Sequence, residues 1–417
     1  MTTGTQQDIE SPYAWTRLFV ALTLMTIGGS GMYVVTVVLP RVQEEFGVGR
    51  SDASLPYTLT MIGFGIGGIL MGKLSDRFGV IAPVMVGALG LGLGFIAAGS
   101  SGSLLQFSLA HGVLIGLAGT SGTFAPLVAD ISMWFNRRRG IAVAICISGN
   151  YLAGTVWPPI VQQFIETAGW RQTYIGTGVF CLIVMPLLGL ALRKRPPIAA
   201  IAAATPVQAA AGFGSPSDRP LGMSPFALQS LLCVAGVACC VAMSMPQVHI
   251  VAYCGDLGFG AARGAQMLSV MLGFGIASRL ISGWICDRIG GLRTLLLGSV
   301  LQGIALFAFL PFNDLVSLFV VSAMFGFFQG GIVPSYAIIV REYFTPKKAG
   351  ARVGTVLMAT LFGMALGGWM SGAIFDWTGS YKAAFVNGIA WNLLNVAIVV
   401  MLLYRARKPA SLQRATA

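Results

Sequence analysis

Charged residues are scarce in this 417-residue chain, where Asp, Glu, Lys and Arg together make up 10% and hydrophobic residues 56%. The mean hydropathy is +0.80. A soluble globular protein carries about 25% charged residues, so this composition excludes that class. Clusters of residues that could act as catalytic nucleophiles, bases or metal ligands are not evident either. The two His (His111 and His249) are well separated and the acidic residues are scattered. We therefore expect neither an enzyme nor a cofactor.

The sequence also lacks the patterns of metal sites, disulfide frameworks and cleaved leaders. Its seven Cys lie within or at the ends of apolar runs, in no metal-ligand spacing, and are interpreted as small core residues. The segment from Met1 to Pro12 is polar and acidic, and the first apolar run is long enough to span a bilayer. We therefore expect no cleavable signal peptide.

Long apolar runs occupy most of the chain. A helix needs about 20 apolar residues to cross a bilayer. Twelve runs are near that length: 18–40, 54–72, 80–99, 104–129, 140–165, 172–192, 226–253, 265–285, 294–311, 315–340, 353–374 and 383–404. The 55 Gly suit transmembrane helices that pack closely through small residues. The sequence thus predicts an all-α membrane protein with twelve transmembrane helices.

Lys and Arg are divided unequally between the two sides of the predicted membrane. With the N-terminus inside, 20 of the 26 fall in the two tails and in the loops after every second run, and five fall on the other side. This positive-inside pattern predicts a multi-pass protein of the cytoplasmic (inner) membrane with both termini in the cytoplasm. Topology accounts for the net charge of +12, so we expect no nucleic-acid partner.

The longest polar gap divides the runs into two groups of six. It begins with Arg-Lys-Arg-Pro-Pro at 193–197, continues through an Ala-rich stretch, and ends near Pro225. Nothing in it can build a core, so we predict a flexible linker. The expected domains are a tail (1–17), a six-helix half (18–192), the linker (193–225), a second six-helix half (226–404) and a tail (405–417). The chain is expected to be a monomer in the lipid bilayer.

One pattern, Gly-x-x-x-Asp-Arg-x-Gly, occurs at the equivalent point of each half. The copies span 72–79 and 283–290, 211 residues apart. Glycine permits a sharp turn and a close helix approach there. The Asp and Arg side chains can form contacts that break as the halves move. We predict a conformational latch made of Gly72, Asp76, Arg77, Gly283, Asp287 and Arg288.

Arg279 lies in an otherwise uncharged run, about four residues or roughly 6 Å from its middle. An Arg at that depth costs at least ~2.5 kcal/mol on insertion scales. It is retained where it pairs, lines a water-filled cavity or binds an anion. The alternatives are that it snorkels to the cytoplasmic edge or bonds backbone carbonyls.

His249 precedes Arg279 by thirty residues, which places the two on neighbouring antiparallel helices. Because imidazole titrates near neutrality, His249 is a candidate to carry a proton or to donate to an anion. The alternative is that His249 is a polar residue near the membrane interface whose hydrogen bonds are made within the protein. His111, in the outer part of its run, is interpreted as interfacial.

The paired Gly-x-x-x-Asp-Arg-x-Gly loops resemble the signature of the major facilitator superfamily between helices 2 and 3 and between helices 8 and 9. The resemblance covers residues 15–405. It implies a major facilitator fold and secondary transport by alternating access, with a substrate site near the midplane between the halves. No ATP-binding Gly-x-x-x-x-Gly-Lys-[Ser/Thr] sequence occurs, so an ion or substrate gradient is the expected energy source.

Two stretches, 246–253 (Pro-Gln-Val-His-Ile-Val-Ala-Tyr) and 134–149 (Trp-Phe-Asn-Arg-Arg-Arg-Gly-Ile-Ala-Val-Ala-Ile-Cys-Ile-Ser-Gly), are similar to bacterial members of the monocarboxylate transporter family. The resemblance implies that Arg279 clamps a substrate carboxylate and that His249 borders the site. A guanidinium fork matches a carboxylate bidentately, which agrees with that role.

Two positions depart from the patterns of related families. Animal members carry an acidic residue one turn before the helix-8 Arg, implicated in proton coupling, where this chain has Gly275. The related oxalate–formate exchangers carry a basic residue deep in helix 11, whereas residues 353–374 here contain no charge. One buried positive charge suits one negative charge, which favours a monocarboxylate over a dicarboxylate.

Other polar or aromatic residues inside the runs are candidates to contact substrate, or else to join helices. Asn150 and Tyr336 rank highest because each lies beside or near a Gly or Pro, where helices deform around cavities. Phe124, two residues before Pro126, is a candidate apolar wall. The remaining candidates are Tyr33, Tyr151, Gln329 and Asn387.

The sequence therefore predicts a secondary transporter of a small monocarboxylate, lactate- or pyruvate-like, coupled to a proton. One alternative is an anion exchanger of the oxalate–formate type. Another is a drug or metabolite exporter, although cationic-drug exporters usually need an acidic residue inside the membrane and the acidic residues here fall at loops or span edges. A membrane receptor without transport activity is the third alternative.

Overall fold

A computed structural model describes residues 9–194, 220–344 and 346–407. Every regular element in these ranges is a helix, and twelve spans are long and apolar enough to cross a membrane. The predicted all-α class with twelve transmembrane helices is therefore confirmed. The expected linker lies mostly outside the described residues, as do the first eight and last ten residues of the two tails.

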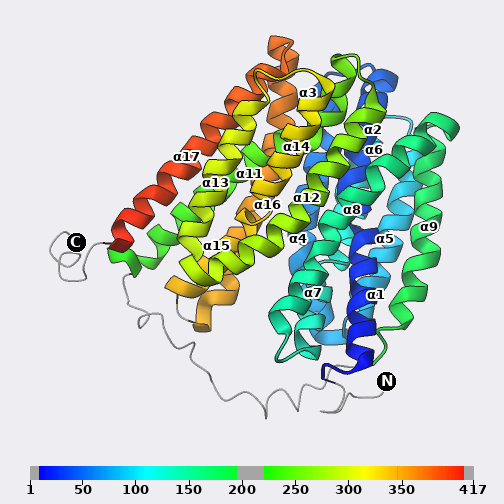
Figure 1. Cartoon of the computed structure of the whole chain (residues 1–417). Coiled ribbons are helices and arrows are strands. Elements are labelled where there is room, and N and C mark those ends of the chain that lie inside the picture. Colours follow the sequence, from blue (N-terminus) through cyan, green and yellow to red (C-terminus); the bar gives the residue numbers. More distant parts are fainter. Residues whose placement is uncertain (1–8, 195–219, 345, 408–417) are drawn as a thin grey trace. The chain divides into compact units, whose positions relative to one another are not determined.

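The chain forms two compact units (Figure 1). Unit 1 comprises Met1–Ala209 and Cys254–Ser269, and unit 2 comprises Ala210–Tyr253 and Val270–Ala417. The hairpin tip between α11 (Pro225–Asp256) and α12 (Ala261–Ile289) thus groups with unit 1. There Asp256 accepts two hydrogen bonds from the Arg50 guanidinium, at 2.7 and 2.5 Å, and the Ser269 hydroxyl donates to the carbonyl of Thr155.

The elements of the first six spans are α1 (Pro12–Gly28), α2 (Ser30–Phe46), α3 (Arg50–Ala53), α4 (Leu55–Phe78), α5 (Ile81–Gly99), α6 (Leu104–Leu109), the π-helical η2 (Ala110–Thr120), α7 (Ala125–Trp134), α8 (Arg139–Ala168) and α9 (Trp170–Leu190). The later elements are the short η3 (Pro220–Gly222), α11 (Pro225–Asp256), α12 (Ala261–Ile289), α13 (Gly291–Ala308), α14 (Leu315–Gln329), α15 (Ile332–Tyr343), α16 (Pro346–Thr378) and α17 (Tyr381–Arg407). The first, second, fourth and tenth spans each contain a break.

Glycine allows α4 and η2 to meet backbone to backbone in unit 1. A Cβ atom at Gly63 would lie 2.2 Å from the carbonyl oxygen of Gly112, and one at Gly67 would lie 2.2 Å from that of Leu117. On η2, a Cβ at Gly116 would lie 2.5 Å from the carbonyl of Thr60. The four-residue spacing of glycines places them on one helix face, where two backbones can approach closely.

Unit 2 repeats this packing between α12 and α14. A Cβ at Gly326 would lie 1.8 Å from the carbonyl oxygen of Met271, and one at Gly330 would lie 2.4 Å from that of Gly275. A Cβ at Gly331 would lie 2.1 Å from the Ser282 side chain. The tenth span therefore breaks, between Gln329 and Ile332, at the place where α12 presses against it.

A buried ion pair joins α1 to α7 at one end of unit 1. The Arg17 guanidinium donates to both carboxylate oxygens of Asp130, at 2.7 and 2.8 Å, and lies 4.6 Å from the ring centre of Trp134. Arg17 is 1% exposed and Asp130 is 3% exposed. Removing one partner of such a pair would strand a buried charge, so the contact holds the two helix ends together.

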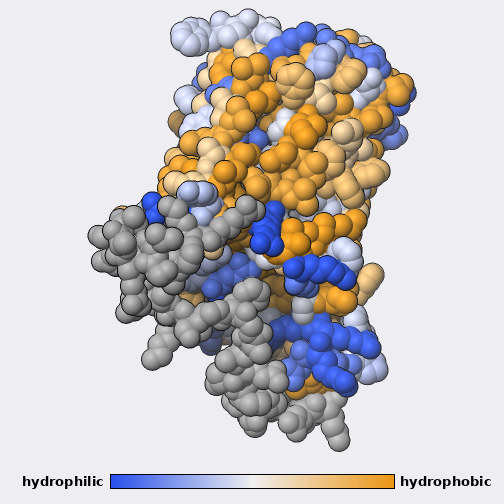
Figure 2. All heavy atoms as spheres, turned by 60° about the vertical axis from the view of Figure 1, so that its left-hand side comes forward, coloured by the Kyte–Doolittle hydropathy of each residue, from blue (hydrophilic) through white to orange (hydrophobic). Residues whose placement is uncertain are grey.

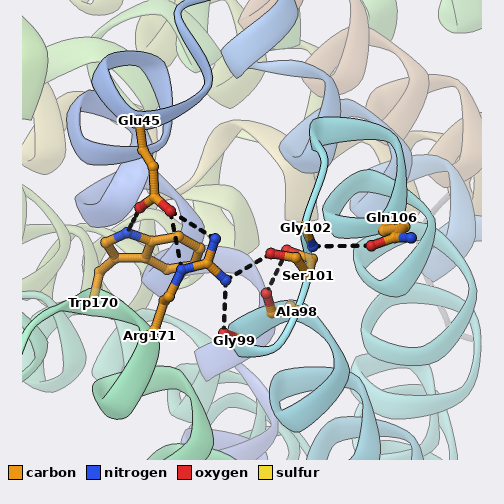
Figure 3. A network of polar contacts seen from close by, with 8 residues as sticks. All are labelled: Glu45, Ala98, Gly99, Ser101, Gly102, Gln106, Trp170 and Arg171. Carbon is orange, nitrogen blue, oxygen red and sulfur yellow. Dashed lines mark hydrogen bonds and ion pairs between the residues drawn. The ribbon is translucent and has the colours of Figure 1, made fainter.

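A second polar network joins the ends of α2, α5 and α9 at the opposite end of unit 1 (Figure 3). Arg171, at the start of α9, donates to Glu45 at the end of α2 and to the carbonyls of Gly99 and Ser101 after α5. The indole of Trp170 also donates to Glu45, at 2.5 Å. One arginine thus satisfies two backbone carbonyls that the end of α5 leaves without a helical partner.

Exposed side chains in the spans are largely apolar. Large residues such as Leu105, Ile183, Phe307 and Leu393 are more than half exposed. On the face shown in Figure 2, hydrophobic side chains gather into a broad area with hydrophilic ones at its margins. A surface of this kind suits contact with lipid, which agrees with the twelve apolar spans.

The glycine contacts on α4 generate a matched pair of variants. Gly67→Ala should lower the thermal stability of the purified protein by about 1–3 kcal/mol, because its methyl group would overlap the Leu117 carbonyl. Gly68→Ala, one residue on, should leave stability unchanged, since its Cβ would meet nothing within 4 Å. Unfolding midpoints in detergent compare the two, and equal losses would contradict this packing.

Candidate functional site

The break between α14 and α15 receives side chains from two other helices of unit 2. From α12, the Nε atom of Arg279 lies 3.5 Å from the carbonyl oxygen of Gly330. From α11, the Nε2 atom of Gln247 donates to Oε1 of Gln329 at 3.1 Å. A bond of 3.5 Å is at the upper limit for this interaction. Arg279 thus contacts a backbone carbonyl, which is one of the alternatives that the sequence left open.

Arg279 itself is half-buried and lies inside the span Ala261–Ile289. Gly275 precedes it by one helical turn, and Ser278 and Ser282 lie on the part of α12 that touches the break. Only glycine at 330 and 331 leaves room for this contact, so no side chain at these positions separates the guanidinium from the broken backbone. The break and the charge therefore occupy the same place in unit 2.

His249 is fully buried and links α11 to α16 and α17. Its Nε2 lies 2.8 Å from the carbonyl oxygen of Gly368, and its Nδ1 lies 3.1 Å from the Tyr381 hydroxyl. A carbonyl can only accept, so Nε2 carries the proton in the neutral ring and Nδ1 accepts from Tyr381. Taking up a proton at Nδ1 requires the Tyr381 hydroxyl to turn and accept instead. Protonation of His249 is thereby coupled to Tyr381.

Tyr381 lies in an aromatic group made by α11, α16 and α17. Its ring centre is 4.5 Å from that of Phe375 and 5.5 Å from that of Tyr253. The Tyr253 hydroxyl donates to Asn313 at 3.0 Å. Sequence reasoning missed Tyr381, because it is the first residue of its helix and looks like an interfacial aromatic. It also missed Gln247, which its place beside Pro246 in an apolar span marks as unusual.

In unit 1 the structure brings two predicted site residues together. The Tyr33 hydroxyl on α2 donates to Oδ1 of Asn150 on α8 at 2.9 Å. The Asn150 amide also lies 3.4 Å from the Met32 sulfur. Tyr33 follows the break of the first span at Gly29 by four residues, so this pair too lies near a helix break. Its role in binding stays a prediction.

Phe124 and Tyr336 have different surroundings. Phe124 is half-buried at the break before α7, and its ring packs edge-on against Phe64 at 5.6 Å. Tyr336 is fully buried, and its hydroxyl donates to Asn395 at 3.1 Å. The Asn395 amide in turn donates to Ser299 at 2.7 Å. Tyr336 therefore belongs to a polar chain of α13, α15 and α17, and substrate contact by either residue stays a prediction.

His111 is not interfacial, contrary to our expectation. It is fully buried in unit 1, with Nδ1 3.0 Å from the Phe107 carbonyl and Nε2 3.3 Å from the Tyr174 hydroxyl. The outer location in the sequence was misleading, because aromatic residues of α6 and α9 enclose the ring. His111 is interpreted as a satisfied core residue.

The two Gly-x-x-x-Asp-Arg-x-Gly copies have the same local geometry. In each, the first seven residues lie in the last turns of a helix and only the final glycine leaves it, with φ of +83° at Gly79 and +82° at Gly290. The expected close approach at the first glycine is absent from the described residues, since a Cβ at Gly72 or Gly283 would meet nothing within 4 Å.

The acidic and basic residues of both copies are exposed. The Arg77 guanidinium lies 5.1 Å from the ring centre of Phe78, and that of Arg288 lies 3.5 Å from the ring of Trp284. At the start of α13, Glu342 accepts from the backbone N–H of Gly291 at 2.9 Å. The latch role of the motifs stays a prediction.

Comparisons with known proteins agree with this architecture. The family model of the Major Facilitator Superfamily matches residues 19–318 and 280–417. Monocarboxylate transporter 13 of Bos taurus is 28% identical over 335 residues, which cover 79% of this chain and 75% of that protein. Monocarboxylate transporter 4 of Rattus norvegicus is 26% identical over 406 residues, covering 94% and 83%. An uncharacterized MFS-type transporter of Escherichia coli, YhjX, is 28% identical over 316 residues, covering 74% and 75%.

Solved structures show the same fold. A peptide transporter POT in complex with sulfate superimposes with a TM-score of 0.73 at 13% identity, covering 94% of both chains. An inward-facing bacterial homologue of the lysosomal transporter Spinster does so with a TM-score of 0.67 at 15% identity, covering 95% of this chain and 96% of that one. The chain belongs to the major facilitator superfamily, as a multi-pass membrane transporter of the monocarboxylate transporter kind.

Proposed function

We propose that this protein carries a small monocarboxylate across the cytoplasmic membrane by alternating access, coupled to a proton. The observation that carries the proposal is Arg279, a half-buried guanidinium inside a span, beside a broken helix. A charge at that depth is costly, so an arginine is retained there mainly where it pairs or binds an anion. The planar guanidinium group matches the two oxygens of a carboxylate. The relatives named monocarboxylate transporters support the same substrate class.

The charge balance favours an anion with one carboxylate. Arg352 precedes the uncharged part of α16 and is engaged at the end of its helix. Its guanidinium donates to the Pro225 carbonyl at 3.3 Å and to Gln229, and lies 4.4 Å from the ring of Phe344. Arg352 is therefore poorly placed to neutralise a second carboxylate beside Arg279. This argues against the oxalate–formate type of exchange.

The acidic residues argue against a cation as substrate. Asp130, Glu45 and Asp256 each form an ion pair with an arginine of unit 1. Glu342 accepts from the start of α13. A carboxylate that already neutralises an arginine cannot also neutralise a cationic drug, so an exporter of such drugs is the less supported alternative.

The proton is proposed to pass through His249. In the neutral ring, Nδ1 accepts from Tyr381, so a proton can enter at that nitrogen when the hydroxyl turns. One proton accompanying one carboxylate makes the cycle nearly electroneutral. The excess of Lys and Arg in the tails and alternate loops supports cytoplasmic termini. The protein is proposed to act as a monomer.

Arg279→Ala should abolish monocarboxylate uptake into proteoliposomes, and Arg279→Lys should be severely impaired, because an ammonium lacks the planar fork. The loss for Arg279→Ala should be at least about 10–100-fold, the value of one or two charged hydrogen bonds. Arg263→Ala is the matched control on α12, since Arg263 is exposed and donates to Gln266. Near-normal uptake by Arg279→Ala would remove the central claim.

His249→Gln should flatten the stimulation of uptake by an inward proton gradient, since glutamine cannot take up a proton. Tyr381→Phe should alter the same pH profile, because the Nδ1 atom loses its donor. His111→Gln is the control: His111 is equally buried but lies in unit 1 and contacts Phe107 and Tyr174. Unaltered pH profiles in both the His249 and Tyr381 variants would assign the proton to another path.

Asp76→Asn and Asp287→Asn should slow turnover more than they weaken substrate binding, because the motifs bias conformational populations rather than contact substrate. Substrate affinity and exchange rate are measured side by side. The control is Asp314→Asn, an exposed acid that caps α14, where hydrogen bonds from Ser317 lower the pKa of its carboxyl. Asparagine can replace it as a cap. A large loss of affinity with an unchanged rate would refute the latch role.

A further inference from the structure

Two cysteines are adjacent in α11, inside unit 2. The sulfur atoms of Cys239 and Cys240 lie 3.6 Å apart, and the Cys239 thiol also donates to the Gly236 carbonyl at 3.3 Å. Cys239 is 0% exposed and Cys240 is 1% exposed. This burial agrees with their interpretation as core residues, but two sulfur atoms this close also allow chemistry that a single buried cysteine does not.

The helix keeps this pair as a dithiol. Both side chains are free thiols. The Cα atoms of consecutive residues are about 3.8 Å apart, whereas those of disulfide-bonded cysteines are usually about 4.4–6.8 Å apart. A disulfide between neighbours in a helix would therefore distort the backbone. The two thiols remain able to bind one atom that takes two sulfur ligands.

The surroundings of the pair argue against a metal ion that needs four donors. In the part of the chain that the structure describes, no group of three or more His, Cys, Asp and Glu side chains is placed to hold a metal. Sulfur ligands also prefer soft partners. The partner that fits is therefore a soft atom whose coordination is complete with two sulfur atoms.

The distance between the sulfur atoms distinguishes among soft partners. Two collinear bonds of about 2.3 Å, as in a linear complex of copper(I) or mercury(II), place the sulfur atoms roughly 4.6 Å apart. Two bonds of this length that meet at roughly 100°, as on trivalent arsenic, place them about 3.5 Å apart. The observed distance of 3.6 Å matches the second geometry.

Charge favours the same partner. An arylarsenical with two hydroxyl groups on arsenic is neutral, whereas a metal cation would lose its hydration among the apolar side chains of unit 2 at a large cost in free energy. A neutral aryl compound dissolves in the lipid and reaches the buried thiols when the helix packing opens locally. We therefore expect a slow reaction with the folded protein.

We infer that Cys239 and Cys240 form a binding site for trivalent organoarsenicals, in which arsenic bridges the two sulfur atoms. Each thiol replaces one hydroxyl group on arsenic. An arsenic–sulfur bond forms, an arsenic–oxygen bond breaks, and the thiol proton leaves with the hydroxyl group as water. Arsenic stays trivalent, so the step needs no oxidant or reductant. The site goes beyond the proposed transport, and its occupation does not depend on which substrate is carried.

Occupation of the site should disturb the contact between α11 and α16. A Cβ atom at Gly363 would lie 2.6 Å from the carbonyl oxygen of Val237 and 3.0 Å from the Cβ of Cys240. The two helices thus leave no room for an arsenic atom that carries a phenyl ring. His249 on α11 binds the carbonyl of Gly368 on α16. An arsenical that separates the helices should therefore weaken this bond and lower uptake.

The test treats the purified protein with phenylarsine oxide, removes unbound reagent in excess monothiol, and measures bound arsenical by mass spectrometry of the intact protein. The wild-type protein should retain one arsenical, which the dithiol 2,3-dimercaptopropanol should remove. Cys239→Ser and Cys240→Ser should each weaken retention by about 100-fold or more, because a single sulfur gives no chelate. Cys233→Ser, at a half-buried cysteine of the same helix, is the matched control and should retain the arsenical.

Labelling of the wild-type protein provides a second measurement in case the variants do not fold. After the native protein binds the arsenical, denaturation and brief treatment with N-ethylmaleimide should leave Cys239 and Cys240 unlabelled, while the other five of the seven cysteines react. Protection of a different pair would overturn the inference. Absence of retained arsenical in the wild-type protein, or undiminished retention by Cys239→Ser and Cys240→Ser, would overturn it too. These measurements are independent of the proposed function.

Discussion

The interior of a membrane protein offers no bulk water, so each polar group there needs a partner from the protein or from a ligand. This constraint governs the placement of charge in the chain. Arg17 and Asp130 are retained inside unit 1 because each satisfies the other through two hydrogen bonds. His249 is retained because both ring nitrogens are engaged. The same constraint makes a buried donor without an acceptor informative.

The constraint acts on the backbone as well. Helices can break inside a membrane only where the freed backbone groups are met by protein. In unit 2, glycines at 330 and 331 let α12 approach the break closely enough for Arg279 to reach a carbonyl. Packing through glycine and recognition by a buried charge are therefore consequences of one local arrangement. Replacing these glycines would move the guanidinium as well as the helices.

Periodic and compositional features made the spans and the internal repeat predictable from the sequence. The repeat is visible again in the matching turns at Gly79 and Gly290. The partners of single polar residues were not predictable, because they lie far apart in the chain. His249 and Tyr381 are separated by 132 residues, and nothing local indicates their contact. The chain has 55 glycines, and the sequence does not distinguish the few that lie at helix breaks from the others. His111 was misplaced for the same reason, since its enclosing rings come from other segments.

A single arginine favours an anion with one negative charge but does not distinguish one monocarboxylate from another, because all of them present the same carboxylate group. Selection must then come from neutral groups, since a second charge would alter the number of protons needed for balance. An amide N–H meets this requirement: it discriminates by hydrogen bonding and leaves the net charge unchanged. The Gln302 amide both donates and accepts within unit 2, whereas the Nε2 atom of Gln329 has no hydrogen-bond partner among the described residues.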